Sequence, residues 1–382
     1  MRSKDASIAW SARGILLCAV LAASPAAPED PPAPRMPKLA SPPPIADDGT
    51  ITTPSFELPF SAYASEEAKR ALVRRLRNPM PTPMSSDINE RRRGLDETFF
   101  GPQFERARAL YPCSSKKSSI GGVPVETFEP ASGISPENRE RVLINLHGGG
   151  FIVGGGGLAG AVESIPIASV GRIRVVSVDY RMAPEHRFPA ATEDVVAVYR
   201  QLLESHEPAN IGIYGCSAGG MLTGEAVAWL LEKHLPLPGA IGIFCASTHR
   251  MGEGDSAYIG PHLGSTLPML PPAKGEERVE ITPYFLGTSP SDPLVVPSAS
   301  RDVLRAFPPT LFLTGTRAPE MSGAALSHLE LRELGVRSEL LVFDGMDHGF
   351  VGDPDLPESQ RAYHLVAQFF AENLGRPLAH RR

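Results

Sequence analysis

The chain has 382 residues, of which 42% are hydrophobic and 21% are charged, proportions typical of a globular protein with a substantial core. A formal charge of −6 gives no basic excess to bind a phosphate backbone, so nucleic acid is not an expected partner. No apolar run approaches the roughly 18 residues that span a bilayer, and four cysteines are too few for a disulfide framework in a chain of this length.

The N-terminus has the order of features found in a secretory signal. Basic residues precede an apolar stretch at Ile15–Ala23, and small residues follow it. We therefore expect a signal peptide over residues 1–27 and a secreted, periplasmic or cell-envelope location. The alternative is a disordered extension on a cytoplasmic protein, because the apolar stretch is short.

The next segment, residues 28–55, is crowded with proline and has almost no apolar periodicity. Such a segment favours extended, solvated backbone and cannot bury a core. We expect a disordered linker there, followed by a folded domain over residues 56–376. The first expected element of that domain is an amphipathic helix at Glu66–Leu76, because its apolar residues recur on one face.

Short runs that are mostly apolar at both odd and even positions follow after residue 140, and they are typical of strands buried on both faces of a sheet. Helix-length segments separate these runs. Strands that alternate with helices predict right-handed crossovers and a mainly parallel α/β sheet. The expected strands lie at residues 141–147, 174–180, 210–215, 240–247, 310–316 and 338–343, and the expected helices at residues 190–204, 218–232, 323–334 and 357–374.

A glycine-rich stretch, His147-Gly148-Gly149-Gly150, directly follows the first of these strands. Backbone amides can converge on a developing oxyanion only where side chains do not shield them, so consecutive glycines suit an oxyanion hole. The candidate donors are the amides of Gly149 and Gly150. The alternative is a flexible glycine loop that binds no ligand.

The stretch Gly215-Cys216-Ser217-Ala218-Gly219 ends the third expected strand, and a helix follows at once. This strand, turn and helix context is that of a nucleophile elbow, in which a tight turn lifts the serine hydroxyl clear of the sheet. We predict that Ser217 is a catalytic nucleophile and that the Ala218 amide is a further oxyanion donor. A glycine-rich turn of this kind can also serve packing alone or hold a phosphate.

Together with "VDYRMAPEHRFPAATEDVVAVYR" at residues 178–200, these motifs make the chain resemble the α/β-hydrolase family of esterases and lipases named for hormone-sensitive lipase. The resemblance runs from about Phe56 to the C-terminal helix. It implies an α/β-hydrolase fold, mainly a parallel sheet flanked by helices, with an N-terminal helical cap at about residues 56–115 over the acyl pocket. It also implies that His147 is a structural residue of the oxyanion loop.

The base comes last in such a chain, in the order serine, acid, histidine. His348 lies in the loop between the last expected strand and the final helix, directly before Gly349-Phe350. The resemblance implies the catalytic base at this position.

The acid is missing from its usual place. The resemblance implies an aspartate in the loop after the strand at 310–316, but the matching residue is Ala318. A triad carboxylate holds the histidine in its correct tautomer and stabilises the imidazolium that forms during attack. In other hydrolases its loss lowers kcat by roughly 10⁴, yet residual turnover remains.

Three carboxylates could replace the missing one. Glu320 lies two residues later in the same loop, and its extra methylene could recover part of the offset, although Pro319 stiffens the path. Asp347 adjoins His348, but neighbouring side chains usually diverge. Asp292 is more typical of a turn. The fourth possibility is that no carboxylate takes over.

Cys216 stands where the family usually has an aspartate. Because the elbow exposes only Ser217, we interpret this thiol as a buried, small, apolar-like residue and not as a second nucleophile.

These residues predict a serine hydrolase that cleaves small carboxylic esters or lactones through an acyl-enzyme, and the resemblance implies short acyl chains. Ser217 is the expected nucleophile, His348 the base and Glu320 the candidate acid. No metal or organic cofactor is expected, because no histidine or cysteine cluster has ligand spacing. The competing hypothesis is a weakly active or inactive hydrolase-like protein that keeps the pocket for binding, and Ala318 is its support. The sequence does not indicate an oligomeric state.

Overall fold

The computed structural model describes residues 43–53, 55, 57–78, 86–265, 267 and 282–376. The expected signal peptide and the first part of the expected linker, up to residue 42, lie outside the described residues. Where residues 43–376 are described, no helix is long and apolar enough to cross a membrane.

The chain divides into two units, Met1–Glu57 and Leu58–Arg382. In the described part of the first unit, a short turn pairs Ile45 with Ile51 in an antiparallel bridge. Both isoleucine side chains are exposed, so this turn contributes no core.

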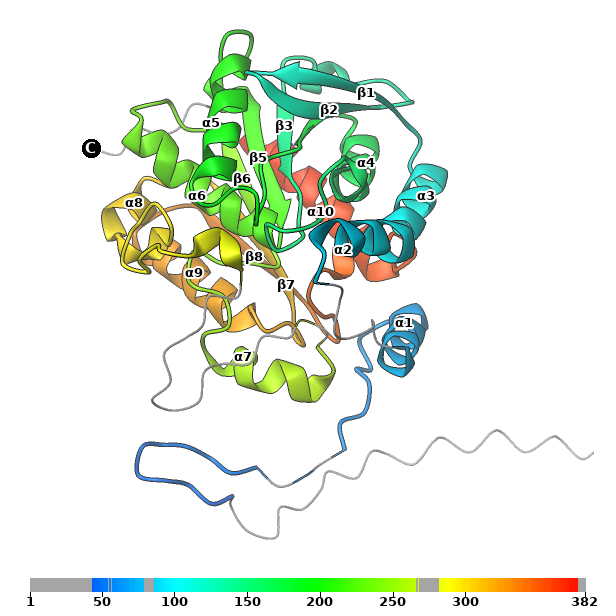
Figure 1. Ribbon diagram of the computed structural model, residues 1–382, viewed down its shortest axis with the longest axis vertical. Coiled ribbons are helices and arrows are strands. Elements are labelled where there is room, and N and C mark those ends of the chain that lie inside the picture. Colours follow the sequence, from blue (N-terminus) through cyan, green and yellow to red (C-terminus); the bar gives the residue numbers. More distant parts are fainter. Residues whose placement is uncertain are drawn as a thin grey trace, which may run out of the picture. The chain divides into compact units, whose positions relative to one another are not determined.

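Within the described part of the second unit, eight strands form one sheet in the order β1-β2-β4-β3-β5-β6-β7-β8 (Figure 1). The strands from β3 onward pair in parallel, which confirms the predicted α/β-hydrolase fold. The six predicted strands are β3 (Val142–Leu146), β4 (Arg174–Val178), β5 (Ile211–Cys216), β6 (Ala240–Phe244), β7 (Thr310–Gly315) and β8 (Ser338–Phe343).

A hairpin that the sequence did not predict extends one end of the sheet. It consists of β1 (Cys113–Ile120) and β2 (Val123–Pro130), which pair antiparallel, and β2 continues antiparallel onto β4. Most side chains of β1 are exposed, which explains why it lacks the apolar signature of the central strands.

The central strands are buried on both faces, as the sequence predicts. Leu143 and Ile144 are neighbours on β3, both fully buried, and they belong to two different hydrophobic clusters. Alternate residues of one strand therefore pack into two hydrophobic cores, one on each face of the sheet.

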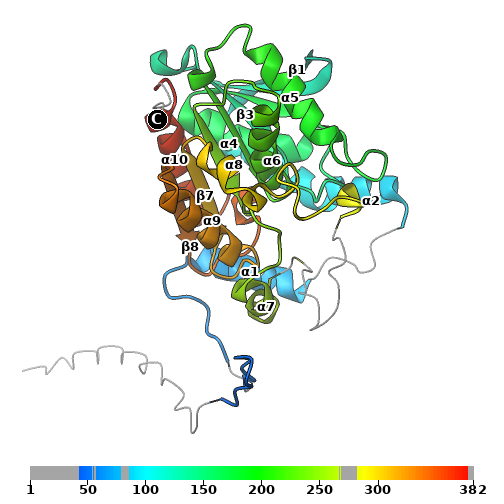
Figure 2. The same ribbon diagram turned by 90° about the vertical axis from the view of Figure 1, so that its left-hand side faces the viewer.

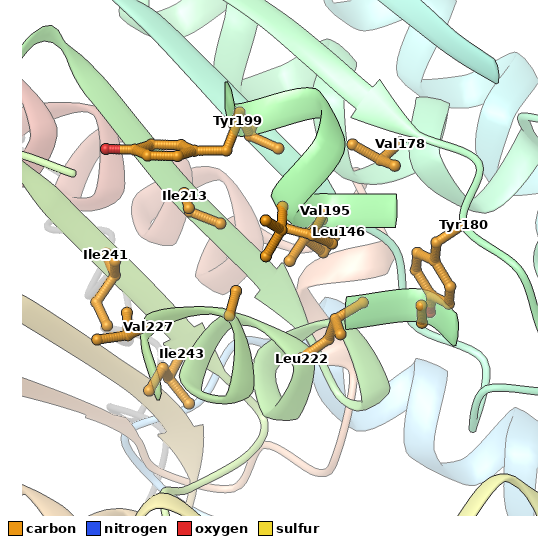
Figure 3. Close-up of a cluster of buried hydrophobic side chains, with 14 of the residues drawn as sticks. Leu146, Val178, Tyr180, Val195, Tyr199, Ile213, Leu222, Val227, Ile241 and Ile243 are labelled. Carbon is orange, nitrogen blue, oxygen red and sulfur yellow. The ribbon is translucent and has the colours of Figure 1, made fainter. Parts of the chain in front are cut away.

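Helices α5 (Ala190–Leu202), α6 (Ala218–Glu232) and α9 (Met321–Glu333) cover one face of the sheet, and α4 (Leu158–Gly171) and α10 (Pro357–Asn373) cover the other. Figure 2 shows α5, α6 and α8 (Arg301–Arg305) on the side turned to the viewer. Figure 3 shows part of the core beneath α5 and α6, where side chains such as Val195 and Leu222 pack on strand residues such as Ile213. Of these helices, the sequence predicted α5, α6, α9 and α10, but not α4 or α8.

The N-terminal part of this unit is helical, with α1 (Glu66–Arg77), α2 (Ile88–Leu95), a π-helical turn η1 (Asp96–Phe100) and α3 (Gly101–Leu110). The predicted amphipathic helix is α1, which Ser65 caps by accepting from the Ala68 amide. Shorter helices are α7 (Asp255–Ile259) and the 3-10 turns Pro136–Asn138, Pro208–Asn210, Gly260–Leu263, Pro283–Phe285, Pro297–Ala299 and Phe350–Gly352.

Two polar anchors attach these N-terminal helices to the rest of the unit. Ser65 donates to the carboxylate of Glu358 at the start of α10, through both its amide and its hydroxyl. Arg92 of α2 forms a two-pronged pair with Glu185 at 2.7 and 2.8 Å. Because both anchors engage charged side chains, they fix the orientation of the helices as well as their position.

Candidate active site

The carboxyl ends of the parallel strands meet at one edge of the sheet, where ligands bind in folds of this type. At this edge, β5 passes through Ser217 into α6 with no intervening loop. Ser217 has φ 58° and ψ −121°, a strained conformation of the kind that persists at functional sites.

Glycine is required on both sides of Ser217 for steric reasons. A Cβ at Gly219 would lie 1.7 Å from the Leu146 carbonyl oxygen, and one at Gly215 would lie 2.2 Å from the same atom. The crossing of the elbow over the end of β3 therefore leaves no room for side chains, which gives the GxSxG pattern its structural cause.

The side chains of Ser217, His348 and Glu320 form one hydrogen-bonded chain. Ser217 Oγ lies 2.9 Å from His348 Nε2, and His348 Nδ1 lies 3.0 Å from Glu320 Oε2. With Nδ1 donating to the carboxylate, Nε2 is left as the acceptor for the serine proton. The structure thus brings together three residues that are 103 and 28 positions apart in sequence (217 to 320, 320 to 348).

Glu320 immediately precedes α9, and its carboxylate is buried. Its second oxygen, Oε1, accepts a hydrogen bond from Thr314 Oγ1 of β7 at 3.2 Å. A carboxylate with a hydrogen bond at each of its two oxygens has little rotational freedom. The orientation of Glu320 toward His348 is therefore fixed before reaction.

The other positions considered for the acid lie elsewhere. Ala318 is buried in the tight turn after β7. Asp347 forms an ion pair with Arg75 of α1 at 3.1 Å. Asp292 accepts from the Leu294 amide at 2.9 Å within its own turn, in keeping with its interpretation as a turn residue. Of the three candidate carboxylates, Glu320 is the one whose oxygen lies at hydrogen-bonding distance from His348.

The charge of Glu320 stabilises the imidazolium form of His348. Burial of the ring lowers the pKa of His348, but the charge and the hydrogen bond of Glu320, with smaller contributions from Cys245 and Asp347, raise that pKa above its ordinary value. A base with a raised pKa accepts the serine proton more readily once it is deprotonated.

The glycine loop offers free amides next to Ser217. Gly149 and Gly150 have φ of 125° and 62°, and a Cβ at Gly149 would lie 2.1 Å from the Val153 carbonyl oxygen. Among the residues that the structure describes, none accepts a hydrogen bond from the backbone amides of Gly149, Gly150 or Ala218. These N–H groups are thus available to an oxyanion.

His147 is built into the base of this loop. Its ring is buried and stacks on Tyr180 with centroids 4.3 Å apart, and Tyr180 Oη donates to the His147 carbonyl at 2.6 Å. Burial lowers the pKa of His147, so its ring stays neutral. These contacts support the structural role expected of this histidine.

The Cys216 thiol lies in the core beneath the elbow. A hydrogen bond with Cys245 and burial raise the pKa of Cys216 well above its ordinary value, which suppresses the thiolate that nucleophilic attack requires. Cys245 in turn accepts from the Gly349 amide at 3.3 Å, directly after His348. Both thiols therefore pack between the turn that carries Ser217 and the loop that carries His348.

A cavity with a volume of about 180 Å³ opens beside Ser217. Most of its wall is apolar, with Phe151, Met221, Phe285, Val295 and Val296 among the lining residues. Within the described parts of residues 58–115, no residue lines this cavity. The proposed capping role of that segment therefore stays a prediction.

Sequence reasoning missed two contributors to this site. Thr314 carries a hydroxyl at the end of the apolar run Leu311–Leu313 of β7, and that polar residue beside the acid loop was the available signal. The Glu163 carboxylate accepts a hydrogen bond from the Gly148 amide of the glycine loop, but Glu163 lies on α4, which the sequence did not reveal as a helix. Among the described residues, no group of three or more His, Cys, Asp or Glu side chains is arranged to hold a metal ion.

Residues 143–352 match the family model for the alpha/beta hydrolase fold. An acetyl-hydrolase of Streptomyces hygroscopicus is 28% identical over 262 residues, which cover 68% of this chain and 83% of that protein. Esterase LipU of Mycobacterium tuberculosis is 26% identical over 285 residues, covering 71% of this chain and 92% of that protein.

Solved structures show the same likeness. The crystal structure of an esterase E25 aligns with a TM-score of 0.69 at 29% identity, covering 85% of this chain and 99% of that one. An esterase from the bacterial hormone-sensitive lipase family aligns with a TM-score of 0.69 at 28% identity, covering 81% and 99%.

Proposed function

We propose that this chain, which belongs to the alpha/beta hydrolase fold family, is a serine hydrolase that cleaves carboxylic esters or lactones through an acyl-enzyme. Its relatives and structural neighbours are esterases and acetyl-hydrolases, among them an esterase of the hormone-sensitive lipase family, and the chain is a carboxylic ester hydrolase of that kind. The observation that carries the serine mechanism is the hydrogen-bonded chain from Ser217 through His348 to Glu320.

In the first half of the reaction, Ser217 Oγ attacks the ester carbonyl carbon while His348 Nε2 takes the hydroxyl proton. The carbonyl oxygen gains a negative charge and accepts hydrogen bonds from the amides of Gly149, Gly150 and Ala218. The imidazolium then gives its proton to the leaving alcohol oxygen, the C–O bond breaks, and the acyl group remains on Ser217.

In the second half, water replaces the alcohol. His348 Nε2 takes a proton from the water as its oxygen attacks the acyl carbon, and the same amides bind the second oxyanion. Collapse of this intermediate returns the proton to Ser217 Oγ and releases the carboxylic acid. Glu320 keeps its negative charge throughout, because its role is to orient the ring and stabilise the imidazolium.

Glu320 fills the role that position 318 cannot. Its side chain starts two residues further along the chain, yet the extra methylene lets Oε2 reach His348 at 3.0 Å. We therefore propose a complete triad and a fully active enzyme. The hydrolase-like binding protein had its support in Ala318, whereas the contact of the Glu320 carboxylate with His348 supports the enzyme.

Short acyl groups suit the cavity. Its volume of about 180 Å³ has room for roughly six groups the size of a water molecule. The apolar wall favours an alkyl chain over a charged one. We propose acetyl to butyryl esters as the preferred substrates.

The proposal of export rests on the sequence of residues 1–27 alone. Expression of the full chain followed by separation of cytoplasm, envelope and medium tests it. A shortened protein outside the cytoplasm supports export, and a full-length protein retained in the cytoplasm contradicts it.

Hydrolysis of p-nitrophenyl acetate and butyrate by the wild type and by Ser217→Ala tests the proposed function. We expect kcat to fall by roughly 10⁶ in the variant, as in other serine hydrolases that lose their nucleophile. Equal rates in the two proteins would rule out the serine mechanism.

A further inference from the structure

We propose that Glu163 of α4 is a positioning residue for the oxyanion hole, which acts by holding the glycine loop against the nucleophile elbow. The inference rests on the proposed function, because it concerns the amides that bind the oxyanion of that reaction. Glu163 does not touch the reacting atoms, and its effect passes through the peptide of Gly148.

The carboxylate of Glu163 connects the loop to the sheet. Its Oε1 accepts from the Gly148 amide at 2.8 Å, and its Oε2 accepts from Asn145 Nδ2 of β3 at 3.0 Å. Asn145 Oδ1 in turn accepts from Ser177 Oγ of β4 at 3.0 Å. The loop residue directly before Gly149 is thus tied through one carboxylate to two neighbouring strands.

The same carboxylate lies beside the elbow. A Cβ at Gly148 would lie 3.3 Å from Glu163 Oε1, 3.5 Å from Ser217 Cβ and 3.0 Å from the Cys216 carbonyl oxygen. The Cys216 backbone also hydrogen-bonds the carboxyl group. Loop, elbow and carboxylate therefore meet at one point, so the carboxylate sets the distance between the oxyanion donors and the nucleophile.

The helix that carries Glu163 is itself held in place. Tyr214 of β5 donates its hydroxyl to the Glu163 carbonyl at 3.2 Å. Tyr214 is fully buried and lies two residues before Cys216. The backbone of Glu163 is thus anchored to the strand that leads into the elbow, and its side chain has a fixed base from which to hold the loop.

A carboxylate at this place is costly for folding. Desolvation raises the pKa of Glu163 to about 7, although hydrogen bonds from Asn145 and from the backbone of Gly148 and Cys216 act in the opposite direction. In return, an N–H bond to a charged acceptor is about twice as strong as one to a neutral acceptor. The stronger hydrogen bond holds the N–H of Gly148, and the position of Gly148 determines where the next amide, that of Gly149, lies.

The expected effect of losing this contact follows from the geometry of oxyanion stabilisation. Loss of one oxyanion donor costs about 10²–10³ in kcat, and a displacement of about 1 Å costs about 10². Because the donors bind the transition state more strongly than the ester, the loss appears in kcat with little change in KM.

Two variants of Glu163 and one control form the experiment, with p-nitrophenyl acetate as substrate. We expect Glu163→Ala to lower kcat by about 10²-fold and to change KM by less than about threefold. Glu163→Gln should keep most of the activity, because its amide oxygen can accept from Gly148 while Asn145 turns over to accept from its amide nitrogen.

Glu225→Ala is the matched control for Glu163→Ala. Glu225 is also a buried carboxyl group with a raised pKa, and it accepts from Thr192 Oγ1 at 3.3 Å inside the core beneath α6. Among the described residues, the hydrogen bond of this carboxyl group is to Thr192 of α5 and not to the glycine loop, so we expect kcat within about threefold of the wild type.

Different results separate the failure of this inference from the failure of the proposed function. If Ser217→Ala abolishes turnover and Glu163→Ala keeps kcat within about threefold, the positioning role is wrong and the serine mechanism stands. If Ser217→Ala retains turnover, the serine mechanism is wrong, whatever Glu163 does.

If Glu163→Ala does not fold, Glu163→Asp decides the matter. The aspartate keeps the charge but is one methylene shorter, so it withdraws from the Gly148 amide, and kcat should fall at least tenfold with KM retained. A wild-type kcat in a folded Glu163→Asp protein contradicts the inference.

Discussion

The turn at Ser217 after β5 and the loop after β7 lie at the same edge of the sheet, and each supplies one member of the proposed triad. The elbow after β5 matches its expected sequence because its backbone crosses β3 too closely for any side chain at Gly215 or Gly219. The acid loop after β7 departs from its expected sequence because a flexible side chain, that of Glu320, can reach the same imidazole from another position. Close backbone packing restricts which residue type can occupy a position, as at Gly215 and Gly219. A long side chain such as that of Glu320 can start at another position, provided that its carboxylate ends beside the imidazole.

Removal of the Glu320 carboxylate should have the largest effect on kcat. We expect Glu320→Ala to lower kcat by roughly 10³–10⁴, because the imidazole loses both its orientation and the charge that stabilises it. Steady-state hydrolysis of p-nitrophenyl butyrate measures this loss. The double variant Glu320→Ala with Ala318→Asp should regain at least tenfold, since an aspartate at the family position restores the carboxylate. A Glu320→Ala enzyme with wild-type kcat would show that this acid loop contributes nothing.

The variant Gly219→Ala tests whether close packing of the elbow backbone on β3 requires glycine at this position. The added Cβ would lie 1.7 Å from the Leu146 carbonyl oxygen, so backbone must shift in the centre of the sheet. We expect destabilisation by about 3 kcal/mol or more, in the range of severe overpacking. Urea unfolding followed by circular dichroism measures it. Gly94→Ala of α2 is the control for clash, because a Cβ there meets no atom within 4 Å and Gly94 has ordinary helical backbone. Equal midpoints for the two variants would contradict the packing account of the elbow.

The ion pair between Arg75 and Asp347 connects α1 to the residue before His348. Asp347 is buried, and Arg75 is partly exposed at 37% of its side chain, so solvent screens the pair. We expect Arg75→Ala to lower kcat by about three- to tenfold through a less ordered histidine loop. Arg70→Ala, which breaks a surface pair with Glu67 on the same helix, should leave kcat unchanged. The same kcat in both variants would mean that α1 does not influence the histidine.

The pH dependence of kcat/KM gives the smallest expected effect. Glu320 raises the pKa of His348, and the reaction needs the neutral ring, so activity should rise with pH through the histidine pKa. In Glu320→Gln the carboxylate charge is gone, the pKa of His348 falls, and the acidic limb should move to lower pH. A limb that stays in place, or that moves to higher pH, contradicts the assignment of Glu320 as the partner of His348.

The raised pKa of His348 also makes the stability of the folded protein depend on pH. A histidine whose pKa is raised by folding stabilises the protein below about pH 6.5, and this contribution is lost as pH rises through the raised value. Thermal unfolding of wild type and Glu320→Gln between pH 6 and pH 9 should therefore show a decline in the wild type that the variant lacks. Parallel curves would contradict the pairing in the folded state.

Much of the fold could be predicted from sequence because the central strands have no solvent-facing side. Runs such as Val142–Leu146 are buried at every position and mostly apolar, and their alternation with helices specifies a parallel α/β sheet. The β1–β2 hairpin and α4 escaped prediction for physical reasons. Strand β1 is largely exposed and polar, and α4 begins among glycines, contains Pro166 and is apolar on most faces, so neither has a clear amphipathic period.

The candidate site divides in the same way. Ser217 and the glycine loop have local signatures, since steric restriction leaves glycine as the residue that fits. The choice of Glu320 over Asp347 and Asp292 could not be made from sequence, because it depends on where three side chains end in space. Asp347 is directed to Arg75 from a helix more than 270 positions away in the chain (75 to 347), and no local pattern reports such a contact.

The most direct test of the account is a crystal structure of the protein after reaction with a p-nitrophenyl alkylphosphonate, which mimics the tetrahedral intermediate. We predict phosphorus bonded to Ser217 Oγ, its oxygen about 2.7–3.1 Å from the amides of Gly149, Gly150 and Ala218, and His348 Nδ1 still on the Glu320 carboxylate. Phosphorus on another residue, or an imidazole turned away from Glu320 in that adduct, would contradict the proposed mechanism.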